Sequence, residues 1–543
     1  MSWRGKASAF VIAVAATAAV VSAQRGRGAA PVNDDRKPGP WFNTPLPPPP
    51  SDPRKPVMKY DDAFGPLPAS FPHRSGRHDE LLDAAALKAD QKKIVGFSLE
   101  SLNAGDKVWG RRAATPSFQH TIEWVVSEFK AAGLKDARVE PFPVTTTMWV
   151  PQTWRVHLVG DPAFGPGTAD VTLQSAFPQP GGATTQITAP VVYVGHGTDA
   201  DLAGRDVRGK IAVVHVRPEP SLFGAAEQGV AAKLVERLGA VGVINAIEGP
   251  GNANYIDGRF ACGKAPCFIV GGNDAWFLQT VVGQAANAGV LDKLTIAMSL
   301  TSTEQGDLRS ANGVGVIPGK SAKRIIINAH ADGYFQGGDD NASGVAVLTS
   351  LARYFAKQPQ PQHTLMFVAS GGHHGPGNGP TSLVAAHPEL KDGTILILNL
   401  EHVAYADVVR GKVRAQGNIG MSWETSVTES AKAVGVTNES PFLFDLWAHA
   451  SRCFGVATYQ SAGTTVSGDL GGYRSLNAPM TQMIQSGTFY HSSGDVYEQV
   501  SPEGLERAAR FHAYFVEKAD RADEALIAAG KGSPYQSKET GCQ

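Results

Sequence analysis

The hydrophobic pattern in the second half of the chain predicts strands that alternate with helices. Apolar runs typical of buried strands lie at residues 324–329, 364–369, 395–400 and 480–485. Residues 342–355 have helical spacing, and Ser501-Pro502 is a typical start for a last helix. Continuous apolar strands interleaved with helices are typical of a parallel sheet that is covered on both faces. We therefore predict an α/β domain with a mainly parallel sheet.

The middle of the chain has a different pattern. Strands are predicted at residues 190–194, 210–216 and 239–244, with a helix over residues 224–238. Glycine and β-branched residues are frequent in this part. The pattern alone predicts a small α/β or β-rich module between about residues 170 and 303.

The first residues predict a targeting segment followed by a tether. A positively charged start precedes a short apolar run at residues 9–21, and small residues follow, as in a secretory signal peptide. The run is shorter than the roughly 20 apolar residues that span a bilayer. We expect cleavage after Ala23 and a secreted or periplasmic protein without a membrane segment. Residues 24–77 are rich in proline, which suits an extended tether.

Composition narrows the function classes. The 543 residues include 49 Lys+Arg against 50 Asp+Glu, so no net field attracts nucleic acid or an anionic membrane. Cys262 and Cys267 are close enough for a small disulfide loop in an oxidising compartment. No Cys-x-x-Cys pair occurs in the sequence, which disfavours a zinc site built from thiolates.

Side chains suited to metal binding follow several of the predicted strands. They lie in the segments His330-Ala331-Asp332, Asp339-Asp340-Asn341, His373-His374, Glu401-His402 and His491. In open α/β sheets, sites form at the carboxyl ends of the strands, and imidazole and carboxylate are ligands suited to zinc. Each segment alone has an ordinary explanation, such as a helix cap at Asp340 or a solvated strand end at Glu401. Together they predict a metal site.

These segments resemble the zinc exopeptidases of metallopeptidase family twenty-eight, which include secreted bacterial aminopeptidases and glutamate carboxypeptidase II. The shared order is His-x-Asp, Asp-Asn-x-Ser-Gly before a helix, a residue pair after a strand, Asn-x-Glu, and Tyr-His-Ser-Ser-x-Asp. The resemblance covers most of the chain from about residue 82. Within it, residues 206–211 and 239–244 are similar to a protease-associated domain, which lies beside the active site of several secreted peptidases.

The resemblance implies two zinc ions that share Asp340 as a bridge. The implied ligands are His330 and Glu401 for one ion, and His374 and His491 for the other. Asp332 matches an aspartate that orients a metal-site group without binding the ion. A water that bridges two zinc ions is acidic enough to supply hydroxide near neutral pH, and the ions polarise the scissile carbonyl.

The chain departs from the family at the residue pair after the second predicted strand. Relatives carry two adjacent glutamates there, the first as general base and the second as ligand, and these align with His373 and His374. Histidine is an ordinary zinc ligand, so His374 can keep that role. Three roles are open to His373: a substitute base, an extra metal ligand, or a remnant in a protein that has lost peptidase activity. Glu401 stands where aspartate is common.

These inferences combine into one interpretation of the chain. The predicted units are a signal peptide at 1–23, a tether at 24–77, a zinc peptidase domain at 78–165 and 306–530, a protease-associated insert at 166–305, and a tail at 531–543. The expected function is a secreted two-zinc exopeptidase that hydrolyses terminal peptide bonds, at the amino end in preference to the carboxyl end. The alternatives are a catalytically impaired binding protein and a zinc amidase with a non-peptide substrate. A peptide or small amide is the expected partner, and the pattern leaves specificity and oligomeric state open.

Overall fold

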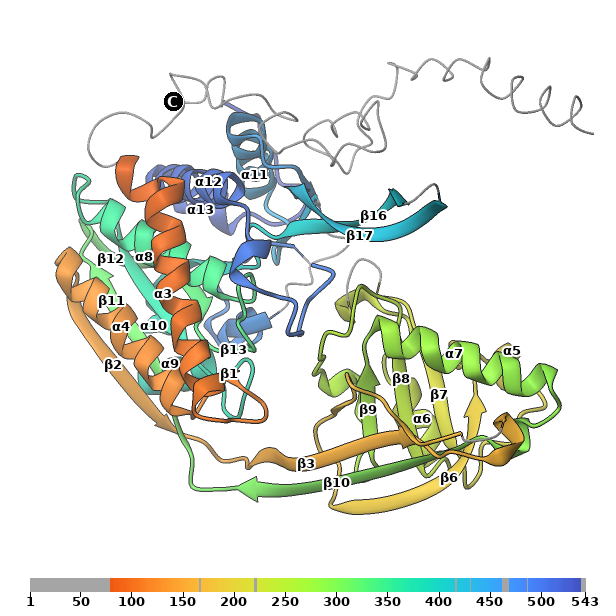
Figure 1. Cartoon of the computed structure of the whole chain (residues 1–543). Coiled ribbons are helices and arrows are strands. Elements are labelled where there is room, and N and C mark those ends of the chain that lie inside the picture. The colour runs from red at the N-terminus through yellow and green to blue at the C-terminus, as the bar shows by residue number, and fades with distance from the viewer. Residues whose placement is uncertain are drawn as a thin grey trace, which may run out of the picture.

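The structure, a computed structural model, describes residues 79–538 apart from 166–167, 219–221, 416–417, 430, 461–467 and 486. The predicted signal peptide and tether lie outside the described residues. Two eight-stranded sheets dominate the fold. The long strands β3 (Met148–Leu158) and β10 (Thr295–Gln305) belong to the second sheet and connect it to the first domain (Figure 1). None of the helices in the described part of the chain is both long enough and apolar enough to cross a bilayer.

The first sheet has parallel strands at its centre. Its order is β19 (Thr458–Gln460), β18 (Lys432–Val436), β20 (Met480–Ile484), β15 (Thr394–Glu401), β12 (Ser321–His330), β14 (His363–Ser370), β11 (Arg309–Ile317) and β2 (Lys135–Pro143). Strand β12 pairs in parallel with both β14 and β15, and β15 pairs in parallel with β20. The edge pair of β11 and β2 is antiparallel. The predicted mainly parallel α/β sheet is confirmed.

Helices cover both faces of this sheet. One face carries α3 (Ala84–Asn103), α4 (Pro116–Ala132), α8 (Ala342–Phe355), α11 (Pro441–Phe454) and α12 (Pro502–Arg521). The other face carries α9 (Gly379–Ala386), α10 (Leu390–Gly393) and the 3-10 helix η6 (Gly468–Leu476). Successive strand residues point to opposite faces, so Ile325 and Ile327 of β12 pack in the first core and Ile326 packs in the second. Burial on both faces explains why these strands are apolar throughout.

Local signals set the ends of the helices. At the start of α4, the Thr115 side chain accepts a hydrogen bond from the backbone N–H of Phe118, and Pro116 occupies the first turn. The helix ends at Gly133, whose φ of 88° suits a residue without Cβ. Ser501 and Pro502 start α12 in the same way. Helix α8 begins directly after Asp340 and Asn341, so its capping loop carries residues of the predicted site.

The second sheet is an insertion between β2 and β11, which are neighbours in the first sheet. Its order is β4 (Val171–Thr172), β3, β10, β6 (Thr185–Tyr193), β7 (Ile211–Val216), β8 (Gly242–Ile247), β9 (Cys267–Val270) and β5 (Phe177–Pro178). Its helices are α5 (Asp199–Leu202), α6 (Val230–Glu236) and α7 (Gly272–Asn287). Because β3 pairs with β10 along its length, this insert spans residues 148–305. The predicted start at residue 166 is therefore too late.

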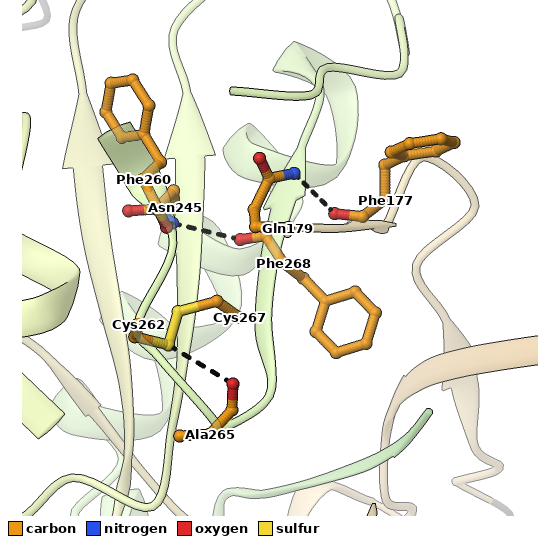
Figure 2. The surroundings of a disulfide bond; sticks show 8 residues. All are labelled: Phe177, Gln179, Asn245, Phe260, Cys262, Ala265, Cys267 and Phe268. Atoms are coloured by element: carbon orange, nitrogen blue, oxygen red, sulfur yellow. Dashed lines mark hydrogen bonds between the residues drawn. A yellow bond between two sulfur atoms is a disulfide. The ribbon is translucent and has the colours of Figure 1, made fainter. Parts of the chain in front are cut away.

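A disulfide closes the loop that leads into β9. Cys262 and Cys267 form it, with a Cα–Cα distance of 5.9 Å, a pairing that the sequence allowed but left open (Figure 2). Asn245 of β8 donates hydrogen bonds from its side-chain amide to the carbonyl oxygens of Phe260 and Phe268 on either side of this loop. The segment just before the loop is therefore fixed to the sheet of the insert.

That segment touches the first domain. Tyr255 forms an isolated β-bridge with Ser492, and the backbone N–H of Ile256 donates to the carbonyl oxygen of His491 over 3.0 Å. The insert thus meets the first domain next to a predicted metal ligand.

Two pairs of strands form two-stranded ribbons outside the large sheets: β1 (Gly110–Arg111) with β13 (Gly333–Tyr334), and β16 (Ala406–Ala415) with β17 (Asn418–Glu429).

Candidate metal centre

The predicted site residues lie at one edge of the first sheet. His330 and Glu401 end the parallel strands β12 and β15. His373 and His374 follow the end of β14, and His491 follows β20. Asp340 lies in the loop before α8. Because carboxyl ends of parallel strands meet at one edge, the fold brings together segments that are far apart in the sequence.

The Asp340 carboxylate is the centre of the cluster. Its Oδ1 lies 2.8 Å from Nε2 of His374, 3.1 Å from Nε2 of His402 and 3.4 Å from Nε2 of His330. Its Oδ2 lies 3.4 Å from Nε2 of His491. All five side chains are buried or nearly so. A single carboxylate therefore has imidazole nitrogens on both of its oxygens.

The second nitrogen of three of these rings is already engaged. Nδ1 of His330 lies 3.0 Å from the carbonyl oxygen of Asp332, and Nδ1 of His402 lies 3.0 Å from that of Gln485. Nδ1 of His491 lies 3.2 Å from the Asp257 carboxylate. An oxygen acceptor requires a proton on Nδ1, so in the neutral form of each ring, the form that binds a cation, Nε2 carries a lone pair that faces the cluster.

Those Nε2 atoms fit a cation. Nε2 of His330, His402 and His491 is buried and has no hydrogen-bond partner among the described residues. Buried polar atoms without partners are rare and need an explanation, such as an ion. Imidazole nitrogens around a carboxylate are a donor set for zinc, and carboxylate or carbonyl partners on the far nitrogen are the usual support of such ligands.

The geometry separates two groups of ligand atoms that share Asp340. One group combines Asp340 with His374 and His491, the residues that the family resemblance implies for one ion. The other combines Asp340 with His330 and His402. Glu401, predicted for this second group, lies close by, with Oε1 3.9 Å from Nε2 of His330. The structure thus adds His402 to the residues around the second position.

His402 was visible in the sequence but had no predicted role. It directly follows Glu401, and in a regular strand the two side chains would point to opposite faces. The backbone of His402 has a φ of 50°, in the left-handed region. This local turn ends the strand alternation, so both Glu401 and His402 reach the cluster.

Asp332 lies behind the ligands. Its Oδ2 accepts a hydrogen bond from the backbone N–H of His374 over 2.5 Å, and its Oδ1 lies 3.7 Å from Nδ1 of His330. Asp332 is fully buried, and the ion pair that the structure shows for it is the one with His330. Its contacts are those of a residue that orients the loop after β14.

His373 has a separate environment. Its ring stacks on that of His330, with centroids 4.1 Å apart and planes at 19°. Its Nδ1 lies 3.1 Å from Oδ1 of Asp469, and its Nε2 lies 3.8 Å from Oε1 of Glu401. Asp469 was not predicted, because it lies 96 residues away in a segment without a recognisable motif. Its nearness to His373 arises only in the folded chain.

The pKa values of the adjacent His373 and His374 are shifted in opposite directions. Burial, and to a smaller extent the neighbouring His373 and His491, lower the pKa of His374 to about 3, against the raising effect of the Asp340 carboxylate. Burial also lowers the pKa of His373, but the Asp469, Glu401 and Asp332 carboxylates together raise it to about 10. Burial disfavours the charge on Asp340, whereas His374 and His402 hold its pKa well below the usual range. These directions describe the protein without cations, and a bound cation opposes protonation of its ligands.

The insert contributes a carboxylate to the cluster. Asp257 accepts a hydrogen bond from Nδ1 of His491 and pairs with the guanidinium of Arg259. Burial disfavours the charge on Asp257, but Arg259 and His491 lower its pKa below the usual range. A metal-ligand candidate of one domain is thus oriented by a residue of the other, which the sequence pattern did not indicate.

A family model matches part of the sequence, and solved structures share the fold. The model of peptidase family M28 matches residues 312–516. An aminopeptidase from Aneurinibacillus sp. strain AM-1 superposes with a TM-score of 0.54 at 21% identity, covering 82% of this chain and 96% of that one. The zinc aminopeptidase BSAP from Bacillus subtilis superposes with a TM-score of 0.56 at 19% identity, covering 82% and 98%. No curated protein sequence matches the chain.

Proposed function

We propose that the chain, whose residues 312–516 match the model of peptidase family M28, is a two-zinc metallo-exopeptidase acting at the amino end of peptides. One observation carries the proposal. The buried Asp340 carboxylate is surrounded by Nε2 atoms that lack hydrogen-bond partners and whose rings are fixed through Nδ1. Such a set of lone pairs suits two cations that share one carboxylate.

The ligand atoms divide into two sets. Asp340, His374 and His491 would hold one ion, and Asp340, His330 and either Glu401 or His402 would hold the other. When bound, the ions would lower the pKa of a water and polarise the scissile carbonyl. Asp332 and Asp257 would keep the ligands oriented through the hydrogen bonds described above.

The chain must also move a proton. Hydrolysis of an amide needs a group that takes a proton from the water and returns one to the leaving amine. His373 lies where the family places its glutamate base, next to the cluster, and 19% of its side chain is exposed. We assign this role to Nε2 of His373, which must be neutral to accept a proton. Its pKa of about 10 belongs to the protein without cations, and two cations beside the ring would lower it.

The preference for the amino end and the place of action are further parts of the proposal. Two of the similar structures are those of aminopeptidases. The substrate would be a peptide or a small amide, and the predicted signal peptide supports a secreted or periplasmic enzyme. The Cys262–Cys267 disulfide is consistent with an oxidising compartment.

The test combines metal analysis with matched substrates. Purified mature protein should bind about two zinc ions per chain and release the first residue from peptides with a free amino end. The same peptides acetylated at the amino end are the control and should not be cleaved. Cleavage of only the carboxyl-terminal residue would contradict the aminopeptidase assignment. Bound zinc without turnover of any amide would favour a binding protein, and absence of zinc would refute the metal centre.

A further inference from the structure

A buried carboxylate from outside the predicted site holds His373. Asp469 lies on η6, is 4% exposed, and receives Nδ1 of His373 on Oδ1 at 3.1 Å. Its other oxygen, Oδ2, accepts hydrogen bonds from the side chains of Asn328 and Ser370. Asn328 is in turn fixed by the hydroxyl of Tyr473, which donates to its Oδ1 over 2.9 Å. Both oxygens of Asp469 are engaged, so the carboxylate has a fixed orientation.

This contact determines the tautomer of His373. An ionised carboxylate only accepts hydrogen bonds, so Nδ1 carries a proton, and in the neutral ring Nε2 then carries the lone pair. Nε2 points toward the candidate metal centre, 3.8 Å from Glu401. Within the described residues, His373 is the only basic side chain in an ion pair with Asp469. Burial disfavours the charge on Asp469, but His373, and to a smaller extent His330, lower its pKa below the usual range.

The stacking geometry argues against His373 as a further ligand of the ion at His330. An imidazole lone pair lies in the plane of its ring, and a zinc ligand nitrogen is about 2.0–2.1 Å from the ion. Ligand atoms of His330, His373 and His374 lie within 4.8 Å of one another. The rings of His330 and His373 are, however, nearly parallel with centroids 4.1 Å apart, so one ion cannot lie in the planes of both rings. The rings of His330 and His374, by contrast, lie at 77° to each other. His373 therefore faces the centre from beside the ligands.

We propose that Asp469 is a positioning residue that makes His373 a substitute for the family's glutamate base, an inference that rests on the proposed function. A neutral imidazole lacks the negative charge of glutamate, and Asp469 supplies that charge behind the ring. The water's proton moves to Nε2, while the Nδ1 proton stays between His373 and Asp469. The Nε2 proton then passes to the leaving amine nitrogen as the C–N bond breaks. Asp469 stabilises the imidazolium without itself taking up the proton.

The experiment compares Asp469→Asn with Asp520→Asn. Asp520 is a matched control, because it is also a buried carboxylate beside a histidine, His363, at the other end of β14. In the zinc-loaded enzyme, Asp469→Asn should lower kcat by about 100-fold or more, with KM and zinc content close to wild type. Asp520→Asn should leave kcat unchanged. Asp469→Glu, which keeps the charge, should recover part of the lost kcat.

A second measurement does not depend on activity. In metal-free protein with nitrogen-15 labelled histidine, the Nδ1 proton of His373 should give a resonance typical of a strong hydrogen bond. That resonance should vanish in Asp469→Asn and persist in Asp520→Asn. If wild type shows it but hydrolyses no amide, the pairing stands and the proposed function alone fails.

Two results would overturn the inference. An unchanged kcat in Asp469→Asn would show that His373 needs no carboxylate. Loss of zinc in step with activity would show that Asp469 supports the metal ligands. If Asp469→Asn does not fold, Asp469→Glu decides by the same resonance and the same kcat.

Discussion

Strand β14 has a histidine and an aspartate at each of its ends. At its amino end, the Asp520 carboxylate accepts the backbone N–H groups of Gln362 and His363 over 2.8 and 2.7 Å. The His363 ring contacts the carbonyl oxygen of Asp520 through Nδ1 and Glu524 through Nε2. Both ring nitrogens have partners, and the contacts tie the strand to the end of α12. This arrangement is complete without any ligand.

The carboxyl end of the same strand has the same residue types in a different state. His373 and His374 lie beside further imidazoles, and several Nε2 atoms of that cluster have no hydrogen-bond partner in the described structure. A folded protein rarely leaves buried polar atoms unsatisfied without a function. The lesson is that residue type does not distinguish a site from a structural contact. Several unsatisfied Nε2 atoms gathered around one carboxylate do, whereas a single one, such as that of His512 in α12, does not.

The largest expected effect follows from removing Asp340, the carboxylate shared by both groups of ligand atoms in the cluster beside the carboxyl end of β14. Asp340→Ala should abolish zinc binding, because both groups of ligand atoms include Asp340. Activity should fall by more than the roughly 10–100-fold that loss of a supporting residue costs. Zinc per chain by mass spectrometry and kcat/KM check this. Retention of both ions would contradict Asp340 as a shared ligand.

The next effect distinguishes His363, at the amino end of β14, from His373, which follows its carboxyl end. His373→Ala should lower kcat by about 100- to 10,000-fold, the range for loss of a general base, while zinc stays bound. His363→Ala is the control: it should lower the free energy of unfolding by leaving the contacts of Asp520 incomplete, with kcat unchanged. Equal kcat losses in the two variants would remove the distinction between the ends.

The fold was predictable because its central strands are apolar runs with clear helical segments between them. The predicted site residues also meet, since each follows a strand or starts a helix. The insert boundary was missed because β3 is half exposed and has no continuous apolar run. Its assignment depends on pairing with β10, more than a hundred residues away, which no local pattern shows.

The missed site residues have a similar explanation. His402 needed its left-handed backbone to face the cluster, and strand alternation predicts the opposite direction. Asp469 and Asp257 come from segments without a motif, and tertiary contacts alone bring them to His373 and His491. Short sequence patterns identify ligands, whereas the residues that orient them are set by the fold.

A smaller effect is expected from removing Asp257, the residue of the insert that holds the candidate ligand His491. Asp257→Ala removes the acceptor for Nδ1 of His491, 3.2 Å away. Loss of such a partner lowers metal affinity by about 10–100-fold, so zinc should compete less well against a chelator. Asp274→Ala is a control in the same domain, because Asp274 is a buried carboxylate that bonds Ser175, within the insert. Equal zinc affinity in wild type and Asp257→Ala would confine the metal centre to one domain.

The smallest effect should come from the structural end. Asp520→Asn keeps the size of the side chain but replaces one of the two oxygens that accept the backbone N–H groups of Gln362 and His363. One buried donor then loses its acceptor, which costs about 1–3 kcal/mol of unfolding free energy. Denaturant unfolding of the metal-free protein measures that loss, while zinc content and kcat of the loaded enzyme should equal those of wild type. A fall in kcat without a change in stability would show that the two ends of β14 are coupled. The contrast between His363, whose ring nitrogens both have partners, and the cluster with unpartnered Nε2 atoms at the other end would then no longer locate the site.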